Sequence, residues 1–170
     1  ALHLTMWTLA VEAQAKMVTF MALQEKSERG NDKPWNDAIS GRTTDKAQMN
    51  ALQKVLDANK GMKVNDIARE KPEALCSVFK AFFTDPMPRQ LYEPYIASFA
   101  IRSMSSRGIS DADFVKERGA LPGMSVNYLQ KCNLSINDPV IVKFFDKRAE
   151  NAIKASMKRV GADPKKFGLK

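Results

Sequence analysis

The chain has 170 residues, of which 27 are lysine or arginine and 19 are aspartate or glutamate, giving a formal net charge of +8. This length predicts one domain, residues 1–170, with a single core. No run of about 18 apolar residues is available to span a bilayer, and the start lacks the basic segment of a signal peptide, so no membrane partner is expected. Because the first residue is not methionine, we expect the termini to be trimmed.

Two cysteines, Cys76 and Cys132, lie far apart in the sequence. Two cysteines in a chain of this size do not make a disulfide framework. The sequence therefore favours a reducing compartment.

Positive charge is concentrated at the C-terminal end. Residues 141–170 hold nine lysines and arginines against three acids, a net of +6, which leaves about +2 for the first 140 residues. Concentrated positive charge indicates a polyanionic partner, either a phosphate backbone or an acidic membrane surface. A solvated basic tail explains the charge equally well.

Helical periodicity begins at the start of the chain. Apolar side chains recur at three- and four-residue steps over residues 2–26, and Gly30 is a plausible stop. Residues 30–43 are punctuated by glycine, proline and asparagine and are predicted to form a loop. Thr44 is a candidate cap for a helix that ends at Gly61.

The middle of the chain is also predicted to be helical. Residues 71–83 form one helix with Pro72 in its first turn. Residues 89–108 form the next, kinked at Pro94, and residues 110–119 open with a capping-box pattern. No sustained alternation marks a strand. The sequence predicts an all-α, single compact domain of about seven helices.

A last helix is predicted to begin near Val140, because Asp138 is a good N-cap and Pro139 suits the first helical position. Asp146 falls inside the apolar arc of this helix. The arc consists of Ile141, Phe144, Phe145, Ala149, Ala152, Ile153, Met157 and Val160. The lysines Lys143, Lys147, Lys154 and Lys158 form a ridge on another side.

A carboxylate that faces a core is destabilising unless it meets a cation or several N–H donors. The position of Asp146 therefore predicts a partner, most simply an arginine from another helix, and Arg89 is one of four candidates. The alternative is an acid at the edge of a broad arc that pairs with Lys143.

Four stretches carry a family resemblance. In order, "RQLYEPYIASFAIRS", "NYLQKCNL", "VKFFDKRAENAIKASMK" and "KKFGL" resemble the core of the coat proteins of flexible filamentous plant viruses, with those of potyviruses and potexviruses nearest. The resemblance covers residues 72–170. The step "FFDK" lacks the family's second aromatic residue, and residues 43–70 have no counterpart.

The resemblance implies a viral coat protein, a helical-capsid subunit that sheaths single-stranded RNA without reading its sequence. It would belong to the virion and to the host cytoplasm during assembly. Identical subunits would be its other partners, and nine methionines suggest apolar surface left for them. In this family an arginine and an aspartate lie together beside the RNA groove, here Arg89 and Asp146. A serine from the N-terminal half joins them, with Ser27 as the positional candidate.

The RNA-binding chemistry requires cations for phosphates and flat side chains for bases. Lys143 and Lys147 are candidate phosphate contacts, although a solvated ridge is equally plausible for either. Tyr92 is the main candidate for base stacking. Tyr95 and Tyr128 are further candidates, and a core position is the stronger alternative for each tyrosine.

An enzyme is not expected. The single histidine, His3, lies near the terminus, and no phosphate-binding loop, paired-cysteine spacing, metal site or cofactor motif is present. One competing resemblance is to Rho-type GTPase-activating domains, carried by "ALCSVFKAFFTDPMPRQLY" and by Arg42. That family's glycine-aromatic-arginine loop is missing, and Thr84 stands where it has an arginine. A basic helical interaction domain is the third possibility.

Overall fold

The computed structural model describes residues 2–40, 46–84, 126–135, 137–144, 147–159 and 161–167. These residues form eight α-helices and three short 3₁₀ turns, and no strand occurs among them. The prediction of an all-α fold is confirmed. The helices expected over 89–108 and 110–119, and the cap expected at Thr44, lie outside the described residues.

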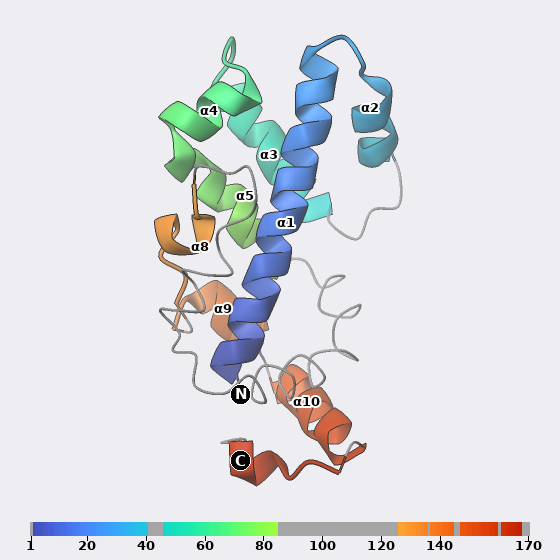
Figure 1. Cartoon of the computed structure of the whole chain (residues 1–170), viewed down its shortest axis with the longest axis vertical. Coiled ribbons are helices and arrows are strands. Elements are labelled where there is room, and N and C mark those ends of the chain that lie inside the picture. Colours follow the sequence, from blue (N-terminus) through green and yellow to red (C-terminus); the bar gives the residue numbers. More distant parts are fainter. Residues whose placement is uncertain are drawn as a thin grey trace.

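Helix α1 (Leu2–Glu28) is the spine of the molecule (Figure 1). Its 27 residues extend for about 40 Å. The helix ends as predicted, because Gly30 has a φ of +87° and its N–H donates to the Ser27 carbonyl. The Asn31 N–H donates to the Lys26 carbonyl, which completes a Schellman motif. The buried stripe of α1 consists of Met6, Leu9, Ala10, Ala13, Gln14, Met17, Phe20 and Met21.

Helix α2 (Lys33–Ser40) corrects the prediction that residues 30–43 form a loop. Pro34 occupies the first turn, where a missing N–H costs nothing. The Asn36 N–H donates to the Asp32 carbonyl at 2.9 Å, and Trp35 is buried. The breaker residues therefore mark the start of a short helix that packs on α1.

Helices α3 (Lys46–Ala58) and α4 (Val64–Glu70) follow, joined by a turn in which Gly61 has a φ of +89°. The helix predicted over 71–83 is confirmed in three pieces: η1 (Pro72–Leu75), α5 (Cys76–Ala81) and η2 (Phe82–Thr84). Helix α3 packs along α5, and both contact α1.

The C-terminal part begins with α8 (Tyr128–Lys131), which contacts α1 and α5, and α9 (Pro139–Phe144), which packs on η2. The helix start predicted at Asp138-Pro139 is confirmed, because the Asp138 carboxylate accepts the Val140 N–H at 3.0 Å. Helix α10 (Lys147–Arg159) and η3 (Pro164–Phe167) complete the chain at the end of the molecule away from α4 (Figure 1).

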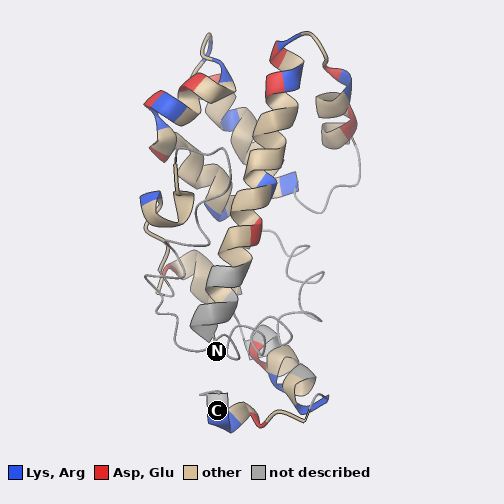
Figure 2. Cartoon of the chain, in the orientation of Figure 1, with Lys and Arg blue, Asp and Glu red and all other residues tan. Residues whose placement is uncertain are grey.

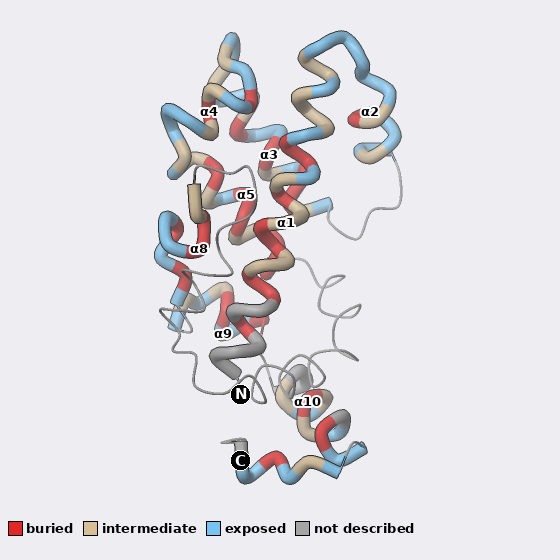
Figure 3. The backbone as a smooth tube through the Cα atoms, viewed as in Figure 1, coloured by how far each residue is buried: buried red, intermediate tan, exposed pale blue. Residues whose placement is uncertain are grey.

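Buried side chains follow α1 and the helices that cover it (Figure 3). Phe83 packs edge-on against Phe79, Phe82 and Phe144, so α5, η2 and α9 share one aromatic cluster. The large apolar side chains that remain exposed in the described part are Ile39 and Val142. Methionines are expected from the sequence to supply apolar surface for neighbouring subunits, but those at 6, 17, 21, 49 and 157 are buried in this core.

Two glutamines lie inside the core and cross-link its helices. Gln48 of α3 donates from Nε2 to the Ala13 carbonyl at 3.0 Å and to the Val78 carbonyl at 3.2 Å, which bridges α1 and α5. Gln14 of α1 accepts the backbone N–H of Tyr128 at 2.9 Å, which anchors α8. Buried polar groups are retained where they are hydrogen-bonded, so these contacts specify how the helices pack.

Candidate nucleic-acid interface

The basic element comprises α10 and η3, and its geometry depends on the turn between them. Gly161 has a φ of +75° and donates to the Lys158 carbonyl, while the Ala162 N–H donates to the Met157 carbonyl at 2.9 Å. This second Schellman motif reverses the chain and lets η3 pack against α10. Lys165 and Lys166 of η3 are thereby brought to the same end of the molecule as α10 (Figure 2).

One face of α10 is buried as the sequence predicts, because Ile153 and Met157 are fully buried and belong to the core cluster. The described lysines of the predicted ridge differ in whether they have an acidic partner. Lys154 forms an ion pair with Glu150 at 2.8 Å. Lys158 is exposed, as is Lys143 in the last turn of α9.

Four exposed lysines of this region have no acidic partner among the described residues. No acid pairs with Lys143, Lys158, Lys165 or Lys166 in the described structure. Basic and acidic side chains alternate at the opposite end of the molecule (Figure 2), where Arg69 pairs with both Asp66 and Glu70. Exposed lysines without an acidic partner among the described residues therefore lie on α9, α10 and η3, as Lys26, Lys33 and Lys54 do in the first part of the chain, and such cations can attract a polyanion.

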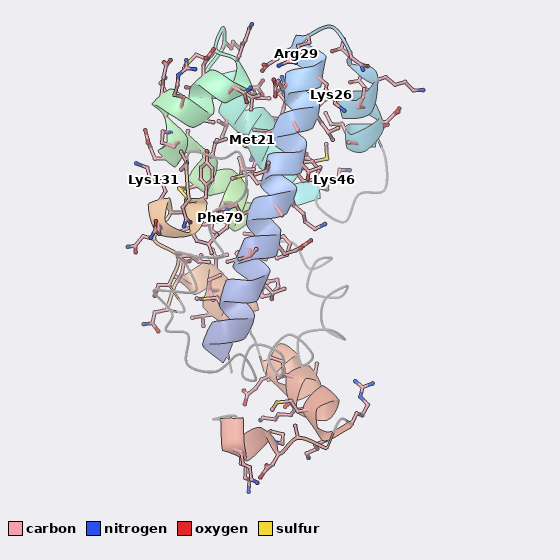
Figure 4. The ribbon with its side chains drawn as sticks, in the orientation of Figure 1. Met21, Lys26, Arg29, Lys46, Phe79 and Lys131 are labelled. Carbon is pink, nitrogen blue, oxygen red and sulfur yellow. A yellow bond between two sulfur atoms is a disulfide. The ribbon has the colours of Figure 1, made fainter. Side chains whose placement is uncertain are left out.

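Ser27 does not join these lysines. It lies near the end of α1 between Lys26 and Arg29, at the end of the molecule away from α10 (Figures 1 and 4). Its hydroxyl donates to the Asp32 carboxylate at 2.5 Å, which ties α1 to the start of α2. This contact is local, and a role of Ser27 in RNA binding stays a prediction.

The remaining predicted site residues have different outcomes. Lys147 opens α10, but its side chain is not described. Arg89, Tyr92 and Asp146 lie outside the described residues, as do Tyr95 and Arg42, so the Arg89–Asp146 pairing stays a prediction.

Tyr128 is fully buried in the core, so the proposal that it stacks on bases is wrong. Burial raises the pKa of its hydroxyl to about 12. The hydroxyl has no hydrogen-bond partner in the described structure, although the backbone N–H of the same residue is bonded to Gln14. The core alternative for this tyrosine is therefore the correct one.

The two cysteines form a disulfide, so the inference from the sequence that they are not cross-linked is wrong, while the compartment stays a prediction. Cys76 opens α5 and Cys132 follows α8, and their Cα atoms lie 5.3 Å apart across a sequence separation of 56 (Figure 4). Packing of α8 against α5 brings them together. No local pattern carries this pairing, because it depends on how helices from distant parts of the chain meet.

A second contact missed by the sequence analysis lies close by. Lys80 of α5 donates from Nζ to Asp138 Oδ2 at 2.8 Å. This hydrogen bond, together with the one from the Val140 N–H, lowers the pKa of the Asp138 carboxyl. Asp138 thus caps α9 and also fastens it to α5.

A small pocket lies between the end of α1 and α4. It is lined by Glu25, Glu28, Arg29, Lys63, Asn65 and Asp66. Several of these charged side chains already have partners within the protein: Arg29 pairs with Glu25, and Glu28 accepts the Val64 N–H at 2.8 Å. In the residues that can be described, no three histidine, cysteine or acidic side chains are arranged to hold a metal ion.

Within the described ranges, none of the helices combines the length and apolar character that a bilayer crossing requires. Comparisons of the chain with protein-family models, with curated proteins and with solved structures find no match.

Proposed function

We propose that the protein binds single-stranded RNA through its phosphates and coats it as the repeated subunit of a helical filament. The observation that supports this most directly is a set of exposed lysines that have no acidic partner in the described part of the chain, namely Lys143, Lys158, Lys165 and Lys166. The resemblance of residues 72–170 to flexible filamentous coat proteins provides the second line of support, independent of the charges.

The chemistry is sequence-blind. A lysine ammonium is a flexible point charge that pairs with a phosphate of any nucleotide and displaces a condensed counterion. Each phosphate neutralised contributes about 0.7 to the slope of log affinity against log salt for a single strand. Neutralising three lysines is therefore expected to reduce the magnitude of that slope by about 2.

The test compares two triple variants of the whole chain. Lys158→Gln/Lys165→Gln/Lys166→Gln removes three charges from the basic element. Lys26→Gln/Lys33→Gln/Lys54→Gln removes three exposed lysines from the other part of the molecule and is the matched control, because the change in net charge is identical. The affinity for a single-stranded RNA of mixed sequence is measured at salt concentrations from about 50 to about 500 mM. Counterion release dominates the change in affinity over this range.

We expect the first variant to bind RNA more weakly and to show a shallower slope of log affinity against log salt. The control is expected to keep the slope of the unmodified protein. Equal behaviour of both variants would show that net charge alone matters and would contradict a localised phosphate site. Negative-stain microscopy of the unmodified protein with RNA tests the filament. Flexuous rods are expected, and their absence under every salt condition that supports binding would remove the coat-protein function.

A further inference from the structure

One turn of α5 holds the following part of the chain at two points. Cys76 and Lys80 are four residues apart in α5, so their side chains lie on the same face. Cys76 is bonded to Cys132, and Lys80 is paired with Asp138. The six-residue step from Cys132 to Asp138 is thus fastened to a single helical face by one covalent and one electrostatic contact.

The two contacts respond to different conditions. The lysine and aspartate side chains are 34% and 16% exposed, so dissolved salt can screen their attraction. The disulfide is indifferent to salt but is broken by thiols. While the disulfide is intact, loss of the ion pair leaves the segment attached.

The disulfide is open to attack from one side. Cys132 is only 7% exposed, whereas Cys76 is partly exposed. A small thiolate of the glutathione class can attack the Cys76 sulfur, which forms a mixed disulfide there and releases the Cys132 sulfur as a thiolate that takes a proton. A second thiol attacks the outer sulfur of the mixed disulfide. The products are two protein thiols and one oxidised small disulfide, so two electrons and two protons pass to the protein.

We propose that the Cys76–Cys132 disulfide is a redox-controlled latch that holds residues 132–144 on α5. With the latch reduced, the segment is held by the Lys80–Asp138 ion pair and by the packing of Phe144 against Phe82 and Phe83, and the ion-pair part of this docking becomes sensitive to salt. The segment contains α9 and leads directly into the basic element. The latch does not require RNA binding, and its test measures none.

The latch predicts local opening without global unfolding. The helices that contact α1 in the first 84 residues do not depend on the disulfide, because α2 and α3 pack on α1 directly. A disulfide opposes any opening that separates its two ends, and for a fully unfolded loop of 56 residues this effect is roughly a thousandfold in the unfolding equilibrium. Even a small part of that effect is expected to speed amide exchange in residues 132–144 by about tenfold or more.

The experiment is hydrogen–deuterium exchange followed by mass spectrometry on the whole chain, oxidised or reduced with dithiothreitol, each at low and at high salt. Peptides from α3 are the internal control. We expect faster exchange across 132–144 on reduction, a further increase with salt in the reduced protein only, and unchanged exchange in α3.

A Lys80→Met variant separates the two contacts. It is expected to exchange like the unmodified protein when oxidised, and to remove the salt effect when reduced. The Cys76→Ser/Cys132→Ser variant is expected to behave as the reduced protein without reductant. Reduction that leaves exchange in 132–144 unchanged would overturn the latch, as would reduction that unfolds α3 together with this segment. Two free thiols in the folded, untreated protein would also overturn it.

Discussion

Point substitutions at Asp138 can separate the contribution of a helix cap from that of an ion pair. Its carboxylate accepts the Val140 N–H as the cap of α9 and the Lys80 ammonium as an ion pair. Asp138→Ala removes both interactions. Asp138→Asn keeps a side-chain oxygen for the cap and removes only the charge.

The expected magnitudes follow from these contacts. Loss of a helix cap costs about 1 kcal/mol. The ion pair is partly exposed on both sides, so screening by solvent limits it to about 0.5 kcal/mol. We therefore expect Asp138→Ala to lower the free energy of unfolding by about 1.5 kcal/mol and Asp138→Asn by about 0.5 kcal/mol.

The pH dependence has a defined sign. The folded-state pKa of the Asp138 carboxyl is lowered from its ordinary value of 3.8, so its charge stabilises the fold above that value and the contribution disappears as the pH falls through the folded pKa. Below both pKa values the unmodified protein carries a neutral carboxyl and should approach Asp138→Asn in stability. Urea unfolding of the oxidised protein at neutral and at strongly acid pH measures this convergence.

A double-mutant cycle with Lys80→Met gives the pairwise free energy directly. Equal destabilisation by alanine and asparagine would refute the separation into a cap and an ion pair. A gap between the unmodified protein and Asp138→Asn that persists in acid would refute the electrostatic origin of the smaller effect.

Three further changes test the core, and a fourth tests a turn. Gln14→Leu leaves the buried Tyr128 N–H without its acceptor, so urea unfolding should show a loss of about 1–3 kcal/mol. Tyr128→Phe removes a hydroxyl that has no partner in the described structure, so the same assay should show little loss or a small gain. Burial raises the pKa of Tyr128 to about 12, so above the ordinary pKa of 10.0 the unfolded state ionises first and the free energy of unfolding falls as the pH rises. Ultraviolet titration should show one late tyrosine that is absent from Tyr128→Phe. Phe144→Ala opens the aromatic cluster at Phe83, so thermal unfolding should show a loss of at least about 3 kcal/mol in the free energy of unfolding. A loss well below that value would contradict tight packing there. Gly61→Ala places a side chain at a φ of +89°, so a loss of about 1 kcal/mol is expected, and a gain would show that the turn relaxes.

Features encoded in a few neighbouring residues were predictable from the sequence. The spacing of apolar side chains located α1, and Gly30 marked its end because a glycine reaches a positive φ without strain. The Asp138-Pro139 dipeptide located the start of α9, because the Asp138 carboxylate caps the helix and a proline suits its first position. The apolar face of α10 was also correct, since Ile153 and Met157 are buried.

Features that depend on contacts between distant residues were not predictable. The sequence predicts a loop where α2 lies because Pro34 is compatible with both a helix start and a chain break. Burial of Trp35 as α2 packs on α1 decides between them. The Cys76–Cys132 bond joins residues 56 apart, and neither cysteine has a neighbour that signals its partner. Nothing in the sequence around Tyr128 distinguishes a base-stacking tyrosine from a buried one, and it is buried because α8 packs against α1 and α5.

The contact between Gln14 and Tyr128 spans 114 positions of the chain, and this has a consequence for synthesis. Ribosomes add about 5–20 residues per second, so about 6–23 s separate the appearance of α1 from that of α8. During that interval the stripe of α1 that α8 will cover faces whatever else the nascent chain meets. We expect this stripe to be the region that chaperones contact first, and that slower translation between α5 and α8 would raise the fraction of chains that aggregate.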